Sequence, residues 1–288
     1  MSAVALDSAW IAAHPAPVHG EGTTKNSRGH VIVAGGARTV PGAPRLTAEA
    51  ALRAGAGKVQ VATIASAVIA LGVLLPEAGM LPLAEDDAGE IDVRDDDALT
   101  KALGRCDAVV IGPGMGSTEA ARVLVGTIAA AASEPALILD AAAIAAAGLA
   151  DAGRSGALLL TPNHDEMARL LDRSPDGIAA EPEAAARAAS DRFKAVVVLK
   201  GRDTFIAVPG ERTLHYSGGG VGLATGGSGD VLAGALAGLL SRGASPLVAA
   251  GWAVWLHGQA ARRLAAEPGP VGFLARELPD QFPRLLPQ

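Results

Sequence analysis

The chain has 288 residues, half of them hydrophobic but only 3% aromatic, and a formal net charge of −6. This length suffices for a large buried core, and the acidic balance argues against a nucleic-acid partner, whose phosphates need a basic face. A single cysteine, Cys106, excludes an intrachain disulfide and fits a reducing compartment. The start of the chain lacks the basic and apolar segments of a secretion signal, and no run of about 18 apolar residues follows. We therefore expect a cytoplasmic protein without a membrane partner.

Short β-branched runs alternate with alanine-rich amphipathic stretches along most of the chain, which predicts repeated βαβ units around a parallel sheet. The predicted strands are His30–Ala34, Lys58–Thr63, Ala108–Ile111, Ala136–Asp140, Ala157–Thr161 and Ala195–Lys200. The predicted helices between them are Leu46–Ala54, Ser117–Ala132, His164–Leu171 and Glu183–Phe193. Thr204–Val208 and Thr213–Tyr216 flank Pro209-Gly-Glu-Arg and predict an antiparallel hairpin.

The last third of the chain has a helical period, which predicts helices over Asp230–Ser241, Pro246–Ala266 and Leu274–Leu285. Together these elements predict an α/β fold of three layers, α/β/α, with a central and mostly parallel sheet flanked by helices. We expect one domain over residues 1–288, with residues 1–28 as an N-terminal extension. Ligands bind such sheets at the carboxyl ends of the strands. An acidic run, formed by Asp86, Asp87, Asp92 and Asp95–Asp97, predicts exposed surface only.

The most informative segment is residues 222–234, Gly-Leu-Ala-Thr-Gly-Gly-Ser-Gly-Asp-Val-Leu-Ala-Gly. A glycine-rich turn that opens a helix directs free backbone N–H groups at one point, which suits a phosphate. Asp230 is unexpected there, because a carboxylate repels an anion. A base that takes a proton from a hydroxyl about to attack phosphorus explains its position. Helix capping by Asp230 is the simpler alternative, but it accounts less well for the whole segment.

Three further motifs follow predicted strands. Lys200-Gly-Arg-Asp-Thr204 places an ammonium group where a nucleotide phosphate could bind, although an isolated Lys-Gly pair by itself favours a solvated lysine. Gly112-Pro-Gly-Met-Gly116 lets a ligand approach the backbone, or forms a tight turn. Asn163 and Glu166 have the spacing of a helix cap and could also organise Mg²⁺ and its waters; the two roles are compatible. His257, inside an apolar helix, is predicted to be a core histidine with a backbone partner.

The segment around Asp230 resembles the signature of the ribokinase-like superfamily, and most closely that of the ADP-dependent NAD(P)H-hydrate dehydratases. The similarity extends in order through Gly29–Gly36, Pro41–Ala43, Ala50–Gly57, Gly112–Gly116, Val198–Gly201 and Trp255–Gly258. The resemblance implies a ribokinase-like fold and ADP-dependent dehydration of the S epimer of hydrated NADH or NADPH, with AMP and phosphate as products. It also implies Mg²⁺, ADP as co-substrate with ATP as an alternative donor, and a homo-oligomer, specifically a tetramer.

The resemblance also assigns residues to roles. Asp230 corresponds to the catalytic base. The residues implied to bind the nucleotide are Lys200, Gly201, Arg202, Asp203, Thr204, Thr225, Gly226, Gly227, Ser228 and Gly229. Those implied to bind the hydrated dinucleotide are Ala43, Gly114, Gly116, Asn163 and Asp230, and Glu166 is expected to act on the metal through water. Because the dehydratase motifs begin by Gly29, we expect no epimerase domain and a separate NAD(P)H-hydrate epimerase as functional partner.

Two segments depart from the family pattern. The dehydratases commonly have Thr-Pro-His-Pro-Gly-Glu where this chain has Thr161-Pro-Asn-His-Asp-Glu166, so Asn163 replaces a histidine that contacts the substrate. Asn163 and Glu166 instead restore the Asn-x-x-Glu spacing of the superfamily's small-molecule kinases. The alternative function is therefore phosphorylation of a hydroxymethyl vitamin precursor of the hydroxymethylpyrimidine or thiazole type. Ala142 stands where the family has an aspartate. A non-catalytic nucleotide sensor is a third possibility, against which Asp230 argues.

Overall fold

A computed structural model describes residues 3–93, 96–150, 154–267 and 269–287. Its centre is a ten-stranded sheet in the order β1-β10-β9-β8-β7-β6-β5-β2-β3-β4. The strands are β1 (Val4–Ala5), β2 (His30–Ala34), β3 (Lys58–Ile64), β4 (Gly79–Leu83), β5 (Ala108–Ile111), β6 (Ala136–Leu139), β7 (Leu158–Leu160), β8 (Val196–Leu199), β9 (Asp203–Ala207) and β10 (Leu214–Ser217). Neighbouring strands run parallel except at β9, which is antiparallel to both β8 and β10.

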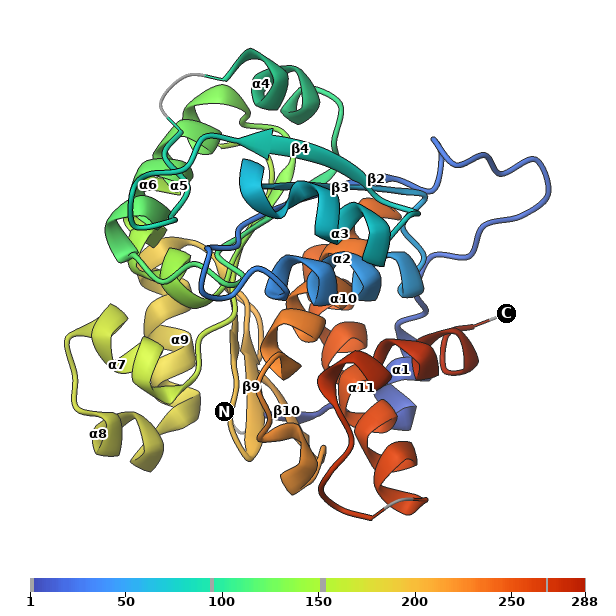
Figure 1. Ribbon diagram of the computed structural model, residues 1–288. Helices are drawn as coiled ribbons and strands as arrows, with labels where there is room; N and C mark the ends of the chain where they lie inside the picture. The colour runs from blue at the N-terminus through green and yellow to red at the C-terminus, as the bar shows by residue number, and fades with distance from the viewer. Residues whose placement is uncertain (1–2, 94–95, 151–153, 268, 288) are drawn as a thin grey trace.

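Helices cover both faces of this sheet. They are α1 (Ser8–Ala13), α2 (Ala43–Arg53), α3 (Val68–Leu74), α4 (Asp97–Leu103), α5 (Thr118–Ala131), α6 (Ala147–Ala150), α7 (His164–Leu171), α8 (Pro175–Ala180), α9 (Pro182–Phe193), α10 (Ser228–Ser241) and α11 (Pro246–Ala266). Figure 1 shows α2, α10 and α11 together on one side and α5 and α9 on the other, which confirms the predicted α/β architecture. Among the residues described, none of these helices is long and apolar enough to cross a lipid bilayer.

The predicted strands are all present, with ends that differ by at most one residue, and the predicted hairpin is β9–β10. Strands β5 and β8 are apolar throughout, and β2 is apolar after His30, because helices bury both of their faces. The prediction of a helix over 274–285 is wrong. Two 3₁₀ helices, η4 (Ala275–Glu277) and η5 (Pro279–Arg284), occupy this segment, because Pro279 and Pro283 lack the N–H groups that an α-helix needs.

The edges of the sheet contain elements that the sequence pattern did not indicate. Strand β4 includes Pro82, which is tolerated because its outer side has no further strand to pair with. At the opposite edge β1 pairs with β10. Residues 1–28, expected as an extension, thus contribute a strand, and Trp10 of α1 is buried against Gly251 of α11.

Two features of the fold position the candidate site. The strand order reverses between β2 and β5, since the chain continues from β2 to β3 on one side and from β5 to β6 on the other. Such a switch point opens a crevice at the carboxyl ends of the strands. Helix α10 is held close to α2 by glycines: a Cβ atom at Gly234 would lie 2.1 Å from the Thr47 carbonyl oxygen, and one at Gly238 would lie 2.5 Å from that of Ala51. This contact fixes where α10 begins.

Candidate active site

Helix α10 begins at the glycine-rich turn, as the sequence predicts. Gly227, the residue before the helix, has φ 90°, a left-handed conformation that favours glycine. Ser228 and Asp230 lie in the first turn. Among the described residues, the backbone N–H groups of Gly229 and Asp230 have no hydrogen-bond acceptor. Free N–H groups at the positive end of a helix dipole form a site for an anion.

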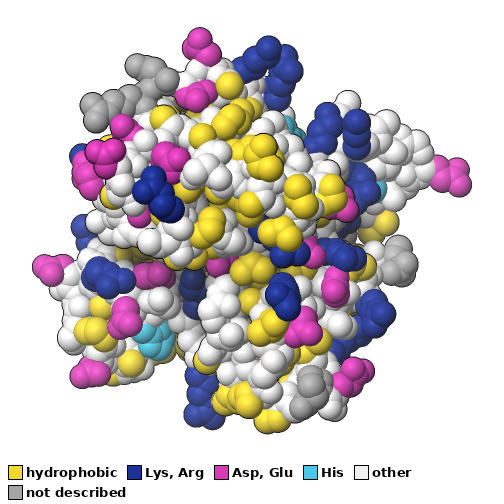
Figure 2. All heavy atoms as spheres, in the orientation of Figure 1, with side chains coloured by type: hydrophobic (Ala, Val, Ile, Leu, Met, Phe, Trp, Pro, Cys, Tyr) yellow, Lys and Arg dark blue, Asp and Glu magenta, His cyan; other side chains and the backbone are white. Residues whose placement is uncertain are grey.

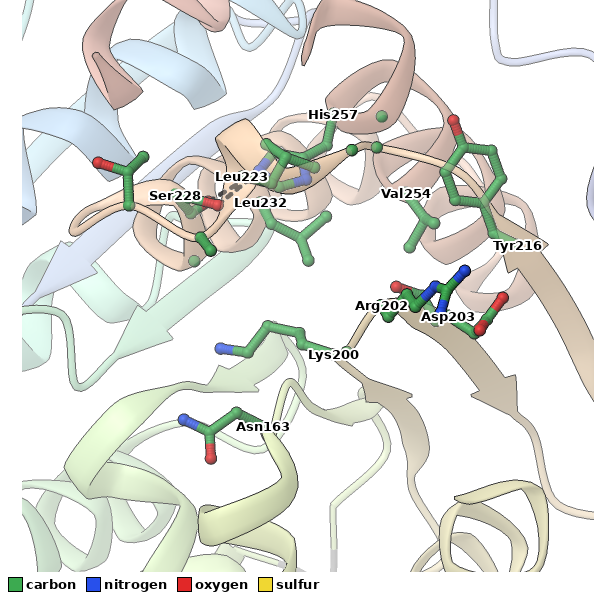
Figure 3. A pocket seen from close by; sticks show the side chains of 18 of the residues that line it. Asn163, Lys200, Arg202, Asp203, Tyr216, Leu223, Ser228, Leu232, Val254 and His257 are labelled. Atoms are coloured by element: carbon green, nitrogen blue, oxygen red, sulfur yellow. Dashed lines mark hydrogen bonds between the residues drawn. The ribbon is translucent and has the colours of Figure 1, made fainter. Parts of the chain in front are cut away.

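His257 supports this turn from α11. It is buried, and its Nε2–H donates to the Ser228 carbonyl oxygen at 3.0 Å. The Ser228 hydroxyl lies 3.2 Å from the same nitrogen, as the dashed lines in Figure 3 show. Burial lowers the pKa of His257 to about 4, so the ring is neutral near pH 7. His257 is therefore the core histidine with a backbone partner that the sequence predicts.

Lys200 is the cation closest to this turn. It follows β8, and its Nζ atom lies 2.8 Å from Oδ1 of Asp140 and 4.0 Å from Oε2 of Glu166. Asp140 follows β6 and also accepts a 2.6 Å hydrogen bond from the Thr161 hydroxyl. Burial alone would lower the pKa of the Lys200 ammonium, but the carboxylates of Asp140, Glu166 and Asp230 raise it overall. Lys200 thus stays charged among three acids.

Asp230 is electrostatically unusual. Burial raises the pKa of its carboxyl group most, the nearby Asp140 carboxylate raises it further, and Lys200 lowers it, which together bring the pKa to about 7. An ordinary aspartate titrates near 3.8. A carboxyl group with a pKa close to the working pH is suited to general acid–base catalysis. The geometry therefore favours a base rather than a cap, since Gly227 and not Asp230 occupies the N-cap position.

These groups line one cleft of about 1250 Å³. The sequence-predicted residues that line it are Asn163, Lys200, Gly201, Arg202, Asp203, Thr204, Thr225, Gly227, Ser228, Gly229 and Asp230. In Figure 3, Lys200 and Asn163 lie on one wall and Ser228 and His257 on the other. Gly226, Ala43, Gly114, Gly116 and Glu166 are not part of the lining. Asp140 and Tyr216 line the cleft but were absent from the predicted site.

The mouth of the cleft is formed by the β9–β10 hairpin. The carboxylate of Asp203 lies 3.0 Å from Nε2 of His215, whose ring stacks on Phe205 at 4.7 Å between ring centres. Tyr216 packs edge-on against Trp255 of α11. Of these side chains, Asp203 and Tyr216 line the cleft, and Tyr216 with Leu223 and Val254 forms an apolar wall that suits a flat organic ring.

Ala43 and Gly114 come together at the switch point, and Gly116 follows Gly114 in the same loop. Gly114 has φ 71°, and a Cβ atom there would lie 2.9 Å from Cβ of Ala43 and 2.5 Å from the Val40 carbonyl oxygen. Gly112, in the same loop, is packed against the Asp140 backbone. The glycine loop after β5 thus connects the start of α2 with the cleft.

Glu90 anchors this loop, and sequence reasoning missed it. Its carboxylate is 8% exposed and accepts hydrogen bonds from the Gly116 N–H at 3.0 and 3.3 Å. The neighbouring acids match the predicted exposed run only in part. Asp86, Asp87, Asp92 and Asp97 are exposed, whereas Asp96 is half-buried and caps α4 by accepting from the Leu99 N–H at 2.8 Å; Asp95 lies outside the described residues. A single glutamate beside many aspartates carries no sequence signal, and only the fold brings it to Gly116.

Removing the Glu90 carboxylate should destabilise the protein. Glu90→Ala leaves the Gly116 N–H without an acceptor, and we expect the free energy of unfolding to fall by about 1–3 kcal/mol. Glu90→Gln keeps an acceptor oxygen, so its loss should be much smaller. Urea unfolding of both variants measures the difference, and equal stability of the two would contradict the anchoring role.

Asn163 and Glu166 form a complete capping box at the start of α7. The Asn163 Oδ1 atom accepts from the Glu166 N–H at 2.8 Å, and Glu166 Oε2 accepts from the Asn163 N–H at 2.8 Å. The helix cap that the sequence predicts is therefore present. Among the described residues, no group of three or more His, Cys, Asp or Glu side chains could enclose a metal ion.

Comparison of the sequence with known proteins identifies the family of this chain. A family model described as NAD(P)H-hydrate dehydratase matches residues 31–284. The chain is 44% identical over 281 residues to the ADP-dependent (S)-NAD(P)H-hydrate dehydratase of Xanthomonas campestris pv. campestris, covering 98% of this chain and 95% of that one. It spans about half the length of the bifunctional NAD(P)H-hydrate repair enzymes that it also matches.

Solved structures agree. The ADP/ATP-dependent NAD(P)H-hydrate dehydratase of Bacillus subtilis, co-crystallised with ATP and Mg²⁺, has a TM-score of 0.84 and 28% identity, over 99% of this chain and 98% of that one. A ribokinase-like superfamily protein of Enterococcus faecalis V583 has a TM-score of 0.81 and 26% identity, over 94% and 90% of the two chains. The chain therefore belongs to the NAD(P)H-hydrate dehydratase family of the ribokinase-like superfamily.

Proposed function

We propose that this chain dehydrates the S epimer of hydrated NADH and NADPH with ADP as phosphoryl donor, returning the reduced dinucleotide, AMP and phosphate. The observation that carries the proposal is the 44% identity to an ADP-dependent (S)-NAD(P)H-hydrate dehydratase over 98% of the chain. The cleft is compatible with this chemistry, because a buried carboxyl group, an ammonium group and a helix N-terminus lie together in it.

Asp230 starts the reaction by taking the proton of the ring hydroxyl of the hydrate. The hydroxyl oxygen then bonds to the terminal phosphorus of ADP while the bond from that phosphorus to the bridging oxygen breaks, releasing AMP. Lys200 and the N–H groups of Gly229 and Asp230 stabilise the negative charge of the phosphoryl group in flight. The original carbon–oxygen bond of the hydrate breaks next, driven by the lone pair of the ring nitrogen, and phosphate leaves with that oxygen. Loss of a proton from the adjacent ring carbon restores the dihydronicotinamide.

The two substrates occupy different parts of the site. Residues 200–204 and 225–229 hold ADP, with its base toward the apolar wall of Tyr216 and Val254. Ala43, Gly114, Gly116 and Asn163 face the hydrated dinucleotide at the switch point. The cleft volume of about 1250 Å³ exceeds the roughly 300–1,000 Å³ typical of a site for one small ligand, which suits a reaction between two.

Mg²⁺ fits this site as a companion of the nucleotide rather than as a metal caged by protein. Mg²⁺ prefers carboxylate and phosphate oxygens and keeps several waters. Only Oε2 of Glu166 takes part in the capping box, so Oε1 is outside the cap and can accept from a metal-bound water. When bound, the ion would neutralise charge on the phosphates of ADP.

Glu166→Gln separates the metal role from the capping role. Glutamine still accepts the Asn163 N–H in a capping box, so the melting temperature should change little. If Glu166 orders the waters of Mg²⁺, the Mg²⁺ concentration for half-maximal activity should rise several-fold. Activity titrated against Mg²⁺, with the melting curve of the same sample, tests this. An unchanged Mg²⁺ requirement would limit Glu166 to capping.

A product assay distinguishes the proposal from the kinase alternative. The Asn-x-x-Glu spacing that suggested a kinase is accounted for by the capping box at α7. A dehydratase releases free phosphate and AMP in equal amounts, whereas a kinase leaves a stable phosphoester. Phosphorus NMR of the reaction with hydrated NADH and ADP should therefore show inorganic phosphate. A persistent phosphoester would move the assignment to the kinase.

The proposal also includes a homo-oligomer, one domain over residues 1–288 and a separate epimerase chain. Helix α3 exposes three apolar side chains, Ile69, Val73 and Leu74, of which Ile69 is 79% exposed. Figure 2 shows hydrophobic side chains gathered over this region of the surface. Exposed apolar patches are typical of interfaces. Light scattering of the purified protein measures the oligomeric state.

A further inference from the structure

A second cleft, of about 760 Å³, lies at the opposite end of the sheet, where β2, β3 and β5 begin. It is lined by the loop before β2, the first residues of β3 and β4, helix α4 and the turn before β5. Figure 2 shows Lys and Arg side chains gathered on this side, between the region of α4 and the loop that protrudes before β2. Nothing in the dehydration reaction uses this cleft.

Four cationic side chains from four different segments line this basic cleft: Lys25, Lys58, Lys101 and Arg105. Among the described residues, none of them forms an ion pair with a carboxylate. The two acids of the lining are Glu77 and Asp107, so the cleft is positive on a protein whose net charge is −6. Unpaired like charges repel one another, and their convergence in one cavity points to an anion that offsets them.

His30 adds an unused polar atom to the same cleft. Its backbone N–H donates to Asp107 Oδ2 at 2.7 Å, and its Nδ1–H donates to the Arg105 carbonyl oxygen at 3.2 Å. The Nε2 atom is buried and has no hydrogen-bond partner among the described residues. In the neutral ring this nitrogen is an acceptor.

The walls of the cleft are held in place by close backbone contacts. A Cβ atom at Gly57 would lie 2.1 Å from the Lys25 carbonyl oxygen, and the Gly57 N–H donates to the Arg28 and Gly29 carbonyl oxygens at 3.1 Å. The protruding loop is thereby fastened to the start of β3, which carries Lys58. The cations therefore belong to a shaped cavity rather than to a loose surface run.

We propose that this basic cleft is a second ligand site, which binds a small phosphate-bearing anion. A phosphate monoester carries roughly −1.5 to −2 at neutral pH, which matches the excess of two cations in the lining. Lysine binds phosphate as a point charge and arginine in a forked geometry, and both are present. The proposal is independent of the dehydratase assignment, because the site lies at the other end of the strands.

Calorimetric titration with inorganic pyrophosphate tests this site in the whole protein. The titration is repeated in proteins that also carry Lys200→Gln, which weakens pyrophosphate binding in the nucleotide cleft and leaves the basic cleft unchanged. The test variant is Lys58→Gln/Lys101→Gln, and both side chains are exposed, so folding should be preserved. The matched control is Arg187→Gln/Arg263→Gln, which removes two exposed cations from α9 and α11.

With Lys200→Gln present, we expect one molecule of pyrophosphate to bind the otherwise unmodified protein and the control variant equally. Affinity should fall at least about tenfold in Lys58→Gln/Lys101→Gln, since hydrogen bonds to a charged ligand are lost. Dehydratase turnover of that variant should be unchanged. No binding in the Lys200→Gln background, or equal weakening in both double variants, would overturn the proposal.

Discussion

Asp230→Asn should lower turnover by at least about 100-fold, because general-base proton transfer contributes 10²–10⁴ to a rate. Asparagine is nearly the same size as aspartate, and Gly227 rather than Asp230 occupies the N-cap, so the start of α10 should not change. ADP should bind as well as before or slightly better, since a negative charge leaves the phosphate site. Single-turnover rates and calorimetric binding of ADP measure the two effects. Asp176→Asn, in the first turn of the remote helix α8, is the matched control.

The same substitution should stabilise the folded protein at alkaline pH. The pKa of Asp230 is raised from 3.8 to about 7 on folding. The folded state therefore binds more protons than the unfolded state between these values, and stability falls as pH rises from about 4 to 7. Asp230→Asn removes this pH-dependent loss of stability, so the melting temperature of the variant should exceed that of the unmodified protein at pH 8, and the difference should vanish near pH 4.

Near-normal turnover of Asp230→Asn would contradict the role of Asp230 as the catalytic base.

Lys200→Gln should reduce turnover by about 100-fold and shift its pH dependence. Loss of a preorganised group that stabilises transition-state charge costs about 10²–10³ in rate. The ammonium group of Lys200 lowers the pKa of Asp230, whereas the carboxylate of Asp140, 2.8 Å from that ammonium group, raises it. In Lys200→Gln only the effect of Asp140 remains. The pKa of Asp230 should therefore rise, and the inflection of kcat/KM, expected near pH 7, should move to higher pH.

Lys200→Arg is the control for this prediction because it keeps the positive charge. The arginine variant should retain an inflection close to that of the unmodified enzyme, even if its turnover is lower. The pH profiles of kcat/KM, measured for the unmodified enzyme, Lys200→Gln and Lys200→Arg, test this prediction. An inflection that stays in place or moves to lower pH in Lys200→Gln would show that Lys200 does not act on Asp230.

Much of the site could be predicted from sequence because its residues lie in short, ordered motifs. The turn before Asp230 and the Lys-Gly pair after β8 are local signals, and the fold needs only to bring two loops together. Asp140, Glu90 and Tyr216 were missed as site residues for a different reason. Each reaches the site through a long-range contact, such as that of Lys200 with Asp140, which no spacing along the chain records.

The elements of the fold that could be predicted are likewise those with a local sequence signal. Buried strands such as β5 and β8 are continuous apolar runs, and the helices between them have a clear period, so both are evident in sequence. The edge strands have weaker patterns: β1 has only two residues and neither is buried, and β4 is buried only at Leu81 and Leu83. The segment after Leu274 has apolar residues at helical spacing, but the backbone chemistry of Pro279 and Pro283 outweighs that pattern.

The most direct test of the central claim follows the absorbance of the reduced nicotinamide after the purified protein is mixed with hydrated NADH. With ADP and Mg²⁺ present, the absorbance should rise until the S epimer is consumed, and one AMP should form for each NADH restored. Without ADP, or with Asp230→Asn, it should remain flat over the same time. Consumption of ADP without any return of the reduced nicotinamide would contradict the assignment of this chain as a dehydratase.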